Sequence, residues 1–290
     1  MNQAQTAIIL KASAPMTDNT STPPIAFIGG GNMASAIIGG LIRQGLPAGQ
    51  IDVVEPFEPA REALRQNFGI AAQPAPTAAL ARAGLVVWAV KPQTFKEAAQ
   101  ATAAHTAQAL HLSVAAGIPS QSIAQWLGTQ QVVRAMPNTP ALVGMGITGL
   151  FARSGVDAAG KAQVEQVVGT TGQHVWVERE DLLDAVTALS GSGPAYVFLF
   201  LEAMTQAGVD MGLSAAQAHQ LAVATFQGAS ELAARSDEAP EVLRQRVTSK
   251  GGTTHAAITH LQAAQVPEHF IAAIRAAEKR AQELAAEFGA

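Results

Sequence analysis

Residues 25–42 read Ile-Ala-Phe-Ile-Gly-Gly-Gly-Asn-Met-Ala-Ser-Ala-Ile-Ile-Gly-Gly-Leu-Ile. The first four form a continuous apolar run with the length of a buried strand. Residues 33–42 carry apolar side chains at helical spacing, and three glycines separate the two segments. The stretch therefore predicts a strand, a tight glycine turn and a helix in immediate succession.

Gly29, Gly31 and Ala34 of this stretch follow the spacing G-x-G-x-x-A. Glycine at the first position permits the tight turn, and glycine at the second lets the backbone approach a pyrophosphate. Alanine at the third lets helix and strand pack closely. Because a helix start also offers free N–H groups and a positive dipole end, the pattern predicts a dinucleotide cofactor. The alternative is a glycine turn with a structural role only.

Composition narrows the class of protein. The chain has 290 residues, a hydrophobic fraction of 48% and a charged fraction of 14%, which indicate one or two globular domains. A net charge of −4 argues against a nucleic-acid surface. The absence of cysteine excludes disulfides and thiolate ligands, and no spacing of His, Asp and Glu predicts a metal site.

No uninterrupted apolar run in the chain is long enough to predict a membrane span. The N-terminus lacks the basic start, apolar middle and cleavage site that predict a secretory signal. We expect a soluble, cytoplasmic protein. Residues 1–24 are polar and rich in Ser, Thr, Asn and Pro towards their end, which predicts a flexible tail.

Further apolar runs predict more strands, and helical segments alternate with them. Such alternation is typical of an α/β fold with a parallel, doubly wound sheet, whose ligands bind at the carboxyl edge. Pro92 is expected to stop the third of these strands and open a loop. The expected strands cover residues 51–55, 85–90, 110–115, 132–136, 147–152 and 174–177, and the segments expected to line one crevice are Gly29–Ala34, Ala89–Pro92, Ala115–Gly117 and Pro137–Thr139.

Glu55 ends the second expected strand. An acid at this place typically accepts hydrogen bonds from the ribose hydroxyls of the adenosine, which favours NAD over NADP. A 2′-phosphate would be repelled there unless a cation compensates, and Arg61 is the nearest candidate. The alternative is a solvated strand end without a ligand.

From Asp181 onward the sequence predicts helices only. We expect a helix over 181–189, a turn at 190–194, and two long helices over 195–209 and 214–234. These two are apolar and alanine-rich around most of their circumference, and such a helix must be buried. The segment is too short to bury both within itself, so we expect a homodimer formed through these helices.

Residues 247–258 read Val-Thr-Ser-Lys-Gly-Gly-Thr-Thr-His-Ala-Ala-Ile. Two glycines, two threonines and a following helix form a start suited to anions, with free N–H groups and hydroxyls. Its distance in sequence from the first glycine turn favours the substrate over the cofactor. The alternative is a capped helix after a flexible turn.

Several motifs together resemble the pyrroline-5-carboxylate reductase family over about residues 25–262. They are Ile28-Gly29-x-Gly31-Asn32-Met33-Ala34, Ala89-Val90-Lys91-Pro92, Met136–Pro140, Leu189–Ala195 and, most specific, Val247-Thr248-Ser249-x-Gly251-Gly252-x-Thr254-x-x-Ala257-Ile258. The resemblance implies a Rossmann-type domain over residues 25–178 and an all-α dimerisation domain over 179–290. It also implies an interwoven homodimer, and dimers that can assemble into decamers.

The resemblance implies the ligands as well. The cofactor would be NADPH or NADH, the substrate 1-pyrroline-5-carboxylate and the product L-proline, in the last step of proline biosynthesis. The substrate would be held by Ser249, Gly252, Thr253 and Thr254. The cofactor would be held by Ile28, Gly29, Gly30, Gly31, Asn32, Met33, Ala34, Glu55, Ala89, Val90, Lys91, Pro92, Ala115, Ala116 and Gly117.

In the implied reaction the hydroxyl of Thr254 is the catalytic group, since it would hydrogen-bond the imine nitrogen. Lys250 and His255 are rival acid–base candidates beside it. Lys250 stands where many family members have proline, and the loop 73–77 lacks the asparagine that many carry near the adenosine. The missing asparagine puts one contact with the adenosine in doubt and, together with Glu55, leaves the preference between NADPH and NADH open.

Two other functions are compatible with a dinucleotide fold. A β-hydroxyacid-type dehydrogenase would need a lysine on the long inter-domain helix, and residues 195–209 contain none. A non-catalytic cofactor sensor would have no need of the motif at Ser249–Thr254.

Overall fold

The computed structural model describes residues 23–289. The tail expected over residues 1–24 therefore lies almost entirely outside the described residues. Its last two residues, Pro23 and Pro24, are described, and the Pro24 carbonyl accepts a hydrogen bond of 3.0 Å from the Gly84 N–H.

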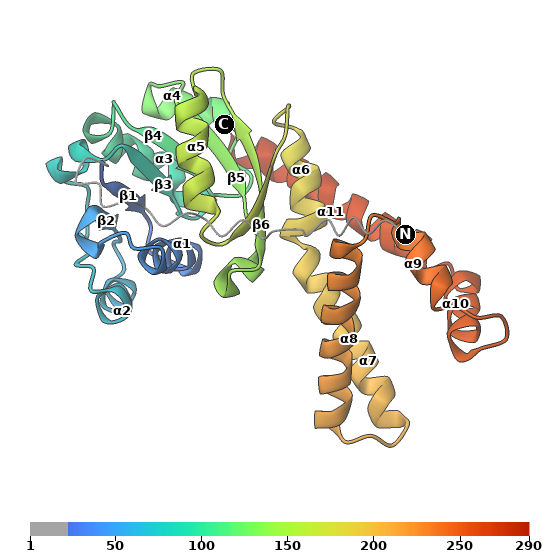
Figure 1. Cartoon of the computed structure of the whole chain (residues 1–290). Helices are drawn as coiled ribbons and strands as arrows, with labels where there is room; N and C mark the ends of the chain where they lie inside the picture. The colour runs from blue at the N-terminus through green and yellow to red at the C-terminus, as the bar shows by residue number, and fades with distance from the viewer. Residues whose placement is uncertain (1–22, 290) are drawn as a thin grey trace, which may run out of the picture.

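One seven-stranded sheet organises the first half of the chain, in the order β2-β1-β3-β4-β5-β6-β7 (Figure 1). Strands β1 to β5 are parallel, which confirms the expected α/β class. The strands are β1 (Ile25–Ile28), β2 (Ile51–Val54), β3 (Leu85–Trp88), β4 (Leu110–Ser113), β5 (Val132–Met136), β6 (Gly146–Ala152) and β7 (Gly172–Trp176).

Strand β6 runs antiparallel to β5, and β7 runs parallel to β6. Only a short 3₁₀ helix, Thr139–Val143, joins β5 to β6. A parallel crossover needs about a dozen residues or more, so this short connection turns the chain straight back. The parallel part of the sheet, and with it the shared carboxyl edge, ends at β5.

Helices cover both faces of the sheet. Successive strand residues point to opposite faces, so Phe27 and Val87 pack with α1, α2 and α5, while Ala26 and Trp88 pack with α3 and α4. Burial of both faces explains why the strands are apolar without alternation. These helices are α1 (Asn32–Arg43), α2 (Glu58–Phe68), α3 (Pro92–Thr102), α4 (Ser120–Leu127) and α5 (Ala158–Val168).

Pro92 does not open a loop, as the sequence suggested; it is the first residue of α3. Proline suits the first helical position because its missing N–H has no partner there and its φ is already helical. Strands β3 and β4 also end two residues earlier than expected. Ala89–Lys91 and Ala115–Gly117 therefore lie in short loops just beyond the sheet edge.

The second half of the chain is helical from α6 onward, as expected. Figure 1 shows α7 and α8 as a hairpin that projects from the sheet, and α9 and α10 beyond the end of α11. The bounds are α6 (Leu182–Val186), α7 (Gly193–Asp210), α8 (Ala215–Arg235), α9 (Pro240–Arg246), α10 (Thr253–Ala263) and α11 (Val266–Phe288).

The turn expected at residues 190–194 is wrong. A π-helical turn, Thr187–Gly191, joins α6 to α7 without an open loop. The Ser192 N–H donates to the Thr187 carbonyl at 2.8 Å, and the Ser190 hydroxyl donates to the Val186 carbonyl. Serine and glycine, which usually signal a turn, here widen a continuous helix instead.

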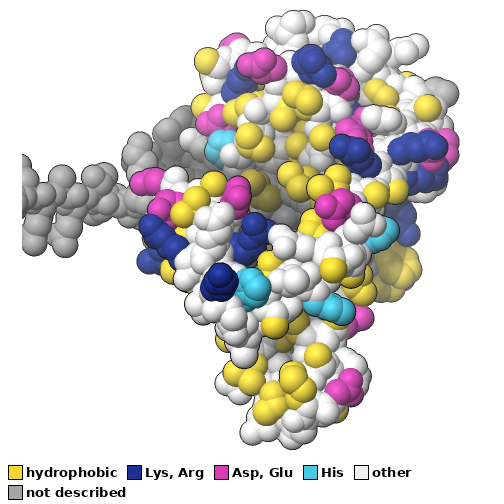
Figure 2. Space-filling view, turned by 90° about the vertical axis from the view of Figure 1, so that its right-hand side faces the viewer, with side chains coloured by type: hydrophobic (Ala, Val, Ile, Leu, Met, Phe, Trp, Pro, Cys, Tyr) yellow, Lys and Arg dark blue, Asp and Glu magenta, His cyan; other side chains and the backbone are white. Residues whose placement is uncertain are grey.

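The projecting helices bury little of their apolar surface. Along the 18 residues of α7 only Gly208 is buried, and Phe198 and Leu199 are 57% and 63% exposed. Figure 2 shows hydrophobic side chains on the surface of this part of the molecule. Within the described residues, one helical stretch, Leu182–Asp210, is long and apolar enough to cross a membrane, which is weak evidence by itself.

Candidate active site

The glycine loop after β1 has the geometry that the sequence predicts. Gly29 has a φ of +95°, and an added Cβ would lie 2.5 Å from the Ala89 carbonyl oxygen, so only glycine fits. A Cβ on Gly31 would meet nothing within 4 Å. Gly31 is also the N-cap of α1 and supplies no side-chain cap. The helix start therefore opens onto free space in front of Gly31, which fits a pyrophosphate.

Glu55, directly after β2, is tied to this loop rather than solvated. Its carboxylate accepts the Gly30 N–H at 2.7 Å and the Phe57 N–H at 2.8 Å. One nitrogen of the Arg61 guanidinium donates to the carbonyl oxygens of Glu55 and Pro56. A carboxylate and a cation thus both stand at the end of β2, where an adenosine ribose would lie.

A cavity of about 300 Å³ adjoins the glycine loop. Its walls are mostly apolar, and Glu97 is the only charged residue among them, which suits a flat, uncharged ring such as adenine. The lining residues are Ile28, Gly29, Val54, Pro56, Pro74, Ala75, Pro76, Val90, Thr94, Glu97, Ala98, Ala101 and Thr102. The loop with the missing asparagine thus contributes prolines to this cavity instead.

The loop Ala115–Gly117 lies on the same sheet edge, beyond β4. Because the strand order is β2-β1-β3-β4, it stands three strands from Glu55, roughly 15 Å away at about 4.8 Å per strand. The loop is ordered by hydrogen bonds from the Val114 N–H to the Trp88 carbonyl and from the Ala115 N–H to the Ser113 hydroxyl. The predicted cofactor residues therefore form one row that an extended dinucleotide can follow.

A second cavity, of about 550 Å³, lies where the end of β5 meets the helical half. Asn138 and Pro140 contribute from the sheet side. The segment Pro137–Thr139, expected to share one crevice with the glycine loop, thus contributes to a different cavity. The other lining residues come from the helices: Leu189, Ser190, Gly193, Pro194, Tyr196, Val197, Phe198, Phe200, Phe226, Phe270 and Ile274.

The second glycine motif forms a helix start, as predicted. Gly251 has a φ of +78°, and Gly252 is the N-cap of α10 without a side-chain cap. The first helical bond runs from the Ala256 N–H to the Gly252 carbonyl. The N–H groups of Thr253, Thr254 and His255 precede it and have no carbonyl within the helix to bind.

The structure does not bring the two glycine motifs together. Figure 1 places α10 beyond the end of α11, far from the sheet edge that carries the glycine loop. Lys250 and His255 are both exposed on this remote helix start. One chain therefore holds the predicted cofactor row and the predicted substrate motif at separate places. No group of three or more metal-ligating side chains occurs within residues 23–289.

Sequence reasoning missed a part-buried ionic cluster at the start of α4, just after the loop at Ala115–Gly117. Glu180 accepts hydrogen bonds from Ser120 and from Arg134, whose side chain is only 9% exposed. The signal was present in β5, where arginine interrupts the run Val-Val-Arg-Ala-Met. A charge inside a buried strand requires a buried partner, but the sequence alone does not say which.

A glycine loop at a helix start, an acid after β2 and a row of loops on one sheet edge define a dinucleotide-dependent oxidoreductase. Comparison with known proteins agrees. Residues 24–117 match the family described as NADP oxidoreductase coenzyme F420-dependent, and residues 180–284 match the family described as pyrroline-5-carboxylate reductase dimerisation.

Similar proteins of known function identify the family within this class of oxidoreductases. The chain is 46% identical over 271 residues to a pyrroline-5-carboxylate reductase of Pseudomonas aeruginosa, covering 93% of this chain and 99% of the relative. It is 40% identical to that of Haemophilus influenzae over 90% of this chain and 97% of the relative. The chain therefore belongs to the pyrroline-5-carboxylate reductase family and is an enzyme.

Solved structures share the whole architecture. A pyrroline-5-carboxylate reductase from Coxiella burnetii matches with a TM-score of 0.85 and 39% identity, over 91% of this chain and 98% of that one. A Plasmodium falciparum pyrroline carboxylate reductase with NADP bound matches with a TM-score of 0.81 and 25% identity, over 91% and 98%. A Rossmann-type sheet followed by a helical dimerisation domain is therefore the fold of this chain.

Proposed function

We propose that this chain performs its family's reaction at a site to which two copies of the chain contribute. The reaction is the reduction of pyrroline-5-carboxylate to proline, the last step of proline biosynthesis, with NADPH or NADH as cofactor, and this chain catalyses it. The β-hydroxyacid dehydrogenase alternative loses support, since α7 contains no lysine.

The observation that carries the shared site is the separation of the two motifs within one chain. The row formed by Gly29–Ala34, Glu55, Ala89–Pro92 and Ala115–Gly117 would hold the cofactor. Ser249, Gly252, Thr253 and Thr254 would hold the substrate, but α10 lies away from that row (Figure 1). Hydride transfer needs reacting atoms about 3–3.5 Å apart. A partner's α10 beside this chain's second cavity, where the end of β5 meets the helical half, satisfies that need.

A homodimer through α7 and α8 brings this about. Their exposed apolar residues lie within the stretch that matches the dimerisation family. The Leu182–Asp210 helix, apolar enough for a membrane, is then covered by protein instead. We place the division between the two domains at residues 178 and 179. A decamer of such dimers stays a prediction, and a cytoplasmic location fits a biosynthetic reaction that draws on NAD(P)H.

Thr254 carries the chemistry that the protein itself supplies. The backbone N–H groups of Thr253, Thr254 and His255 bind the substrate carboxylate at the start of α10. The Thr254 hydroxyl hydrogen-bonds the imine nitrogen and fixes the face of the ring. The bound reduced nicotinamide supplies the hydride to the imine carbon. The C=N double bond becomes a C–N single bond, and with one proton from solvent on nitrogen the product is proline.

The activity is tested by following NADPH and NADH oxidation separately with racemic pyrroline-5-carboxylate and identifying proline as product. Thr254→Ala should lower kcat/KM by about tenfold to a hundredfold, which corresponds to a lost hydrogen bond to a charged group. Thr248→Ala is the matched control, because the Thr248 hydroxyl already donates to the Arg244 carbonyl. Unchanged kinetics in Thr254→Ala would remove this residue from the mechanism. Cofactor binding without turnover would point to another substrate.

A further inference from the structure

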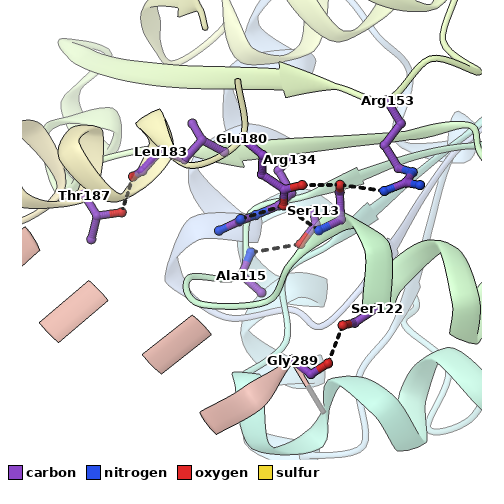
Figure 3. A network of polar contacts seen from close by, with 10 residues as sticks. Ser113, Ala115, Ser122, Arg134, Arg153, Glu180, Leu183, Thr187 and Gly289 are labelled. Atoms are coloured by element: carbon purple, nitrogen blue, oxygen red, sulfur yellow. Dashed lines mark hydrogen bonds and ion pairs between the residues drawn. The ribbon is translucent and has the colours of Figure 1, made fainter. Parts of the chain in front are cut away.

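The corner between the loop at Ala115–Gly117 and α4 is held by Glu180, a charged residue at the start of the helical half. Glu180 accepts the Ser120 N–H at 2.6 Å and the Arg134 guanidinium at 2.8 Å through one oxygen. Its second oxygen accepts the Ser120 hydroxyl at 2.5 Å. Figure 3 shows Glu180 and Arg134 side by side, with Ser113 and Ala115 below them in the view. Ser120 begins α4, so Glu180 also caps that helix at its positive end.

Several features keep Glu180 ionised and in place. Burial alone raises the pKa of Glu180, but the hydrogen bonds from Ser120 and Arg134 outweigh it, and the pKa lies below its usual value. Arg153 donates to the same Ser120 hydroxyl at 3.1 Å (Figure 3). Because Arg134 and a helix start both donate to one carboxylate, and Arg153 holds the Ser120 hydroxyl that also donates to it, the contact resists displacement.

The last turn of α11 holds the same corner from the other side. Gly117 has a φ of +74°, and a Cβ there would lie 3.3 Å from the Leu284 Cβ. The Ser122 hydroxyl donates to the Gly289 carbonyl at 2.5 Å (Figure 3). Phe288 packs against the core cluster that contains Ile118. Glu180 at the start of the helical half and the end of α11 therefore both contact the chain immediately after Ala115–Gly117.

We propose that Glu180 is a positioning residue that sets the loop at Ala115–Gly117 for the nicotinamide half of the cofactor. The inference rests on the cofactor placement in the proposed function, because strand order puts this loop at the end of the row opposite Glu55. Hydride transfer requires that the reacting ring be held in a defined position. A loop that a rigid neighbour already holds in place loses less conformational entropy when the cofactor binds. The helical half thereby acts on the cofactor as well as on the substrate.

Binding of two ligands separates this role from general stability. Glu180→Gln keeps the size of the side chain but removes the charge and the second accepting oxygen. It should raise the Kd of NADPH about tenfold, as expected for the loss of charged hydrogen bonds. It should leave the Kd of 2′,5′-ADP, which carries only the adenosine half, within about twofold. Isothermal titration calorimetry on the full chain measures both.

Asp181→Asn is the matched control. It removes the same charge one residue later, where Asp181 forms an exposed pair with Arg179 at 2.7 Å. Its two Kd values should stay unchanged. Ser120→Ala removes one of the hydrogen bonds to Glu180 and should raise the NADPH Kd about threefold. Ser120→Thr keeps the hydroxyl and should restore the wild-type Kd. If Glu180→Gln does not fold, the comparison of Ser120→Ala with Ser120→Thr (the serine pair) tests the positioning role instead.

The proposal is overturned if Glu180→Gln weakens both ligands equally or neither. It is also overturned if Asp181→Asn has the same effect, or if the serine pair leaves the NADPH Kd unchanged. A different result tests the proposed function itself: wild-type protein that binds 2′,5′-ADP but not NADPH would show that the cofactor does not follow the row to Ala115–Gly117.

Discussion

The sheet and the projecting helices of this chain bury their apolar residues in different ways. Every residue of β1 and β3 is buried, and helices of the same chain cover both faces of the sheet. In α8 only Ala218 and Ala222 are buried, while Leu221 and Leu232 are 57% and 70% exposed. The composition of the two parts is similarly apolar, so the difference lies in what covers them.

The comparison teaches that one part is complete in a single chain, while the other leaves apolar surface that a second chain would cover in the proposed dimer. An exposed apolar surface of this extent marks an interaction site in a folded protein. The same division applies to the site. The predicted cofactor row lies on one chain, whereas the predicted substrate motif lies away from it and would serve a second chain in the proposed dimer.

The strongest way to break the comparison is to place one charge in each part. Phe198→Asp should raise the dimer dissociation constant about a hundredfold, because a carboxylate would be buried at the interface. Phe57→Asp is the control, since Phe57 on the sheet part is 65% exposed and lies away from α7 and α8. Sedimentation velocity across a dilution series measures both. Equal effects, or none, would contradict the shared core.

A second way is to destabilise the sheet core alone by lowering the pH. Burial lowers the pKa of His111 to about 4, against a hydrogen bond to Thr106 that acts in the opposite direction. His111 accepts the Trp88 indole N–H at 3.1 Å and is 1% exposed. In the unfolded chain His111 binds a proton below about pH 6.5, whereas in the folded chain it does so only below about pH 4. Stability therefore falls as pH falls through this window.

The expected loss of unfolding free energy is about 2 kcal/mol between pH 7.5 and pH 5. Urea titrations at both values measure it, and His111→Gln shows how much comes from this residue. The variant should lack most of the pH dependence while the oligomeric state stays the same. A variant with the full wild-type dependence would mean that His111 is not the group that titrates.

The mildest test concerns the adenosine end of the row. Glu55→Gln should raise the ratio of kcat/KM for NADPH to that for NADH about fivefold, because it removes a negative charge facing the 2′-phosphate. Glu97→Gln serves as control, since Glu97 lines the same cavity from α3. An unchanged ratio in Glu55→Gln would leave the choice of cofactor to Arg61 or to the loop at residues 74–76.

Local signals in the sequence were sufficient for the first glycine loop, the parallel strands and the start of α10. Each depends on neighbouring residues: an apolar run, a glycine with positive φ, or a helix start without a cap. The reversal at β6 was not predictable in the same way, because it depends on the length of a connection. Serine and glycine at residues 190–193 predicted a turn, but a helical turn is retained at residues 187–191, where the chain packs against α11.

The candidate site was predictable residue by residue but not as an arrangement. Nothing local tells that Ser249–Thr254 stands far from Gly29 in the same chain. Nor does it tell that Arg134 pairs with Glu180, which lies 46 residues later. Contacts between residues far apart in sequence depend on the path of the whole chain. Contacts between two copies would depend on how the proposed dimer assembles.

The most direct measurement of the shared site is complementation between two variants that are each impaired at one half of it. Gly31→Asp should block the cofactor without strain, because nothing lies within 4 Å of a Cβ at Gly31 and aspartate suits an N-cap. Thr254→Ala removes the hydroxyl at the substrate. The two are coexpressed with different tags, and the heterodimer is isolated on both tags in turn.

If the site is shared, one of the two sites in the heterodimer combines an intact glycine loop with an intact Thr254, and the other carries both defects. The account therefore predicts about half of the wild-type activity per dimer, well above that of either variant alone. If each site is built within one chain, every site carries one defect. Activity no higher than the mean of the two parent variants would contradict the account.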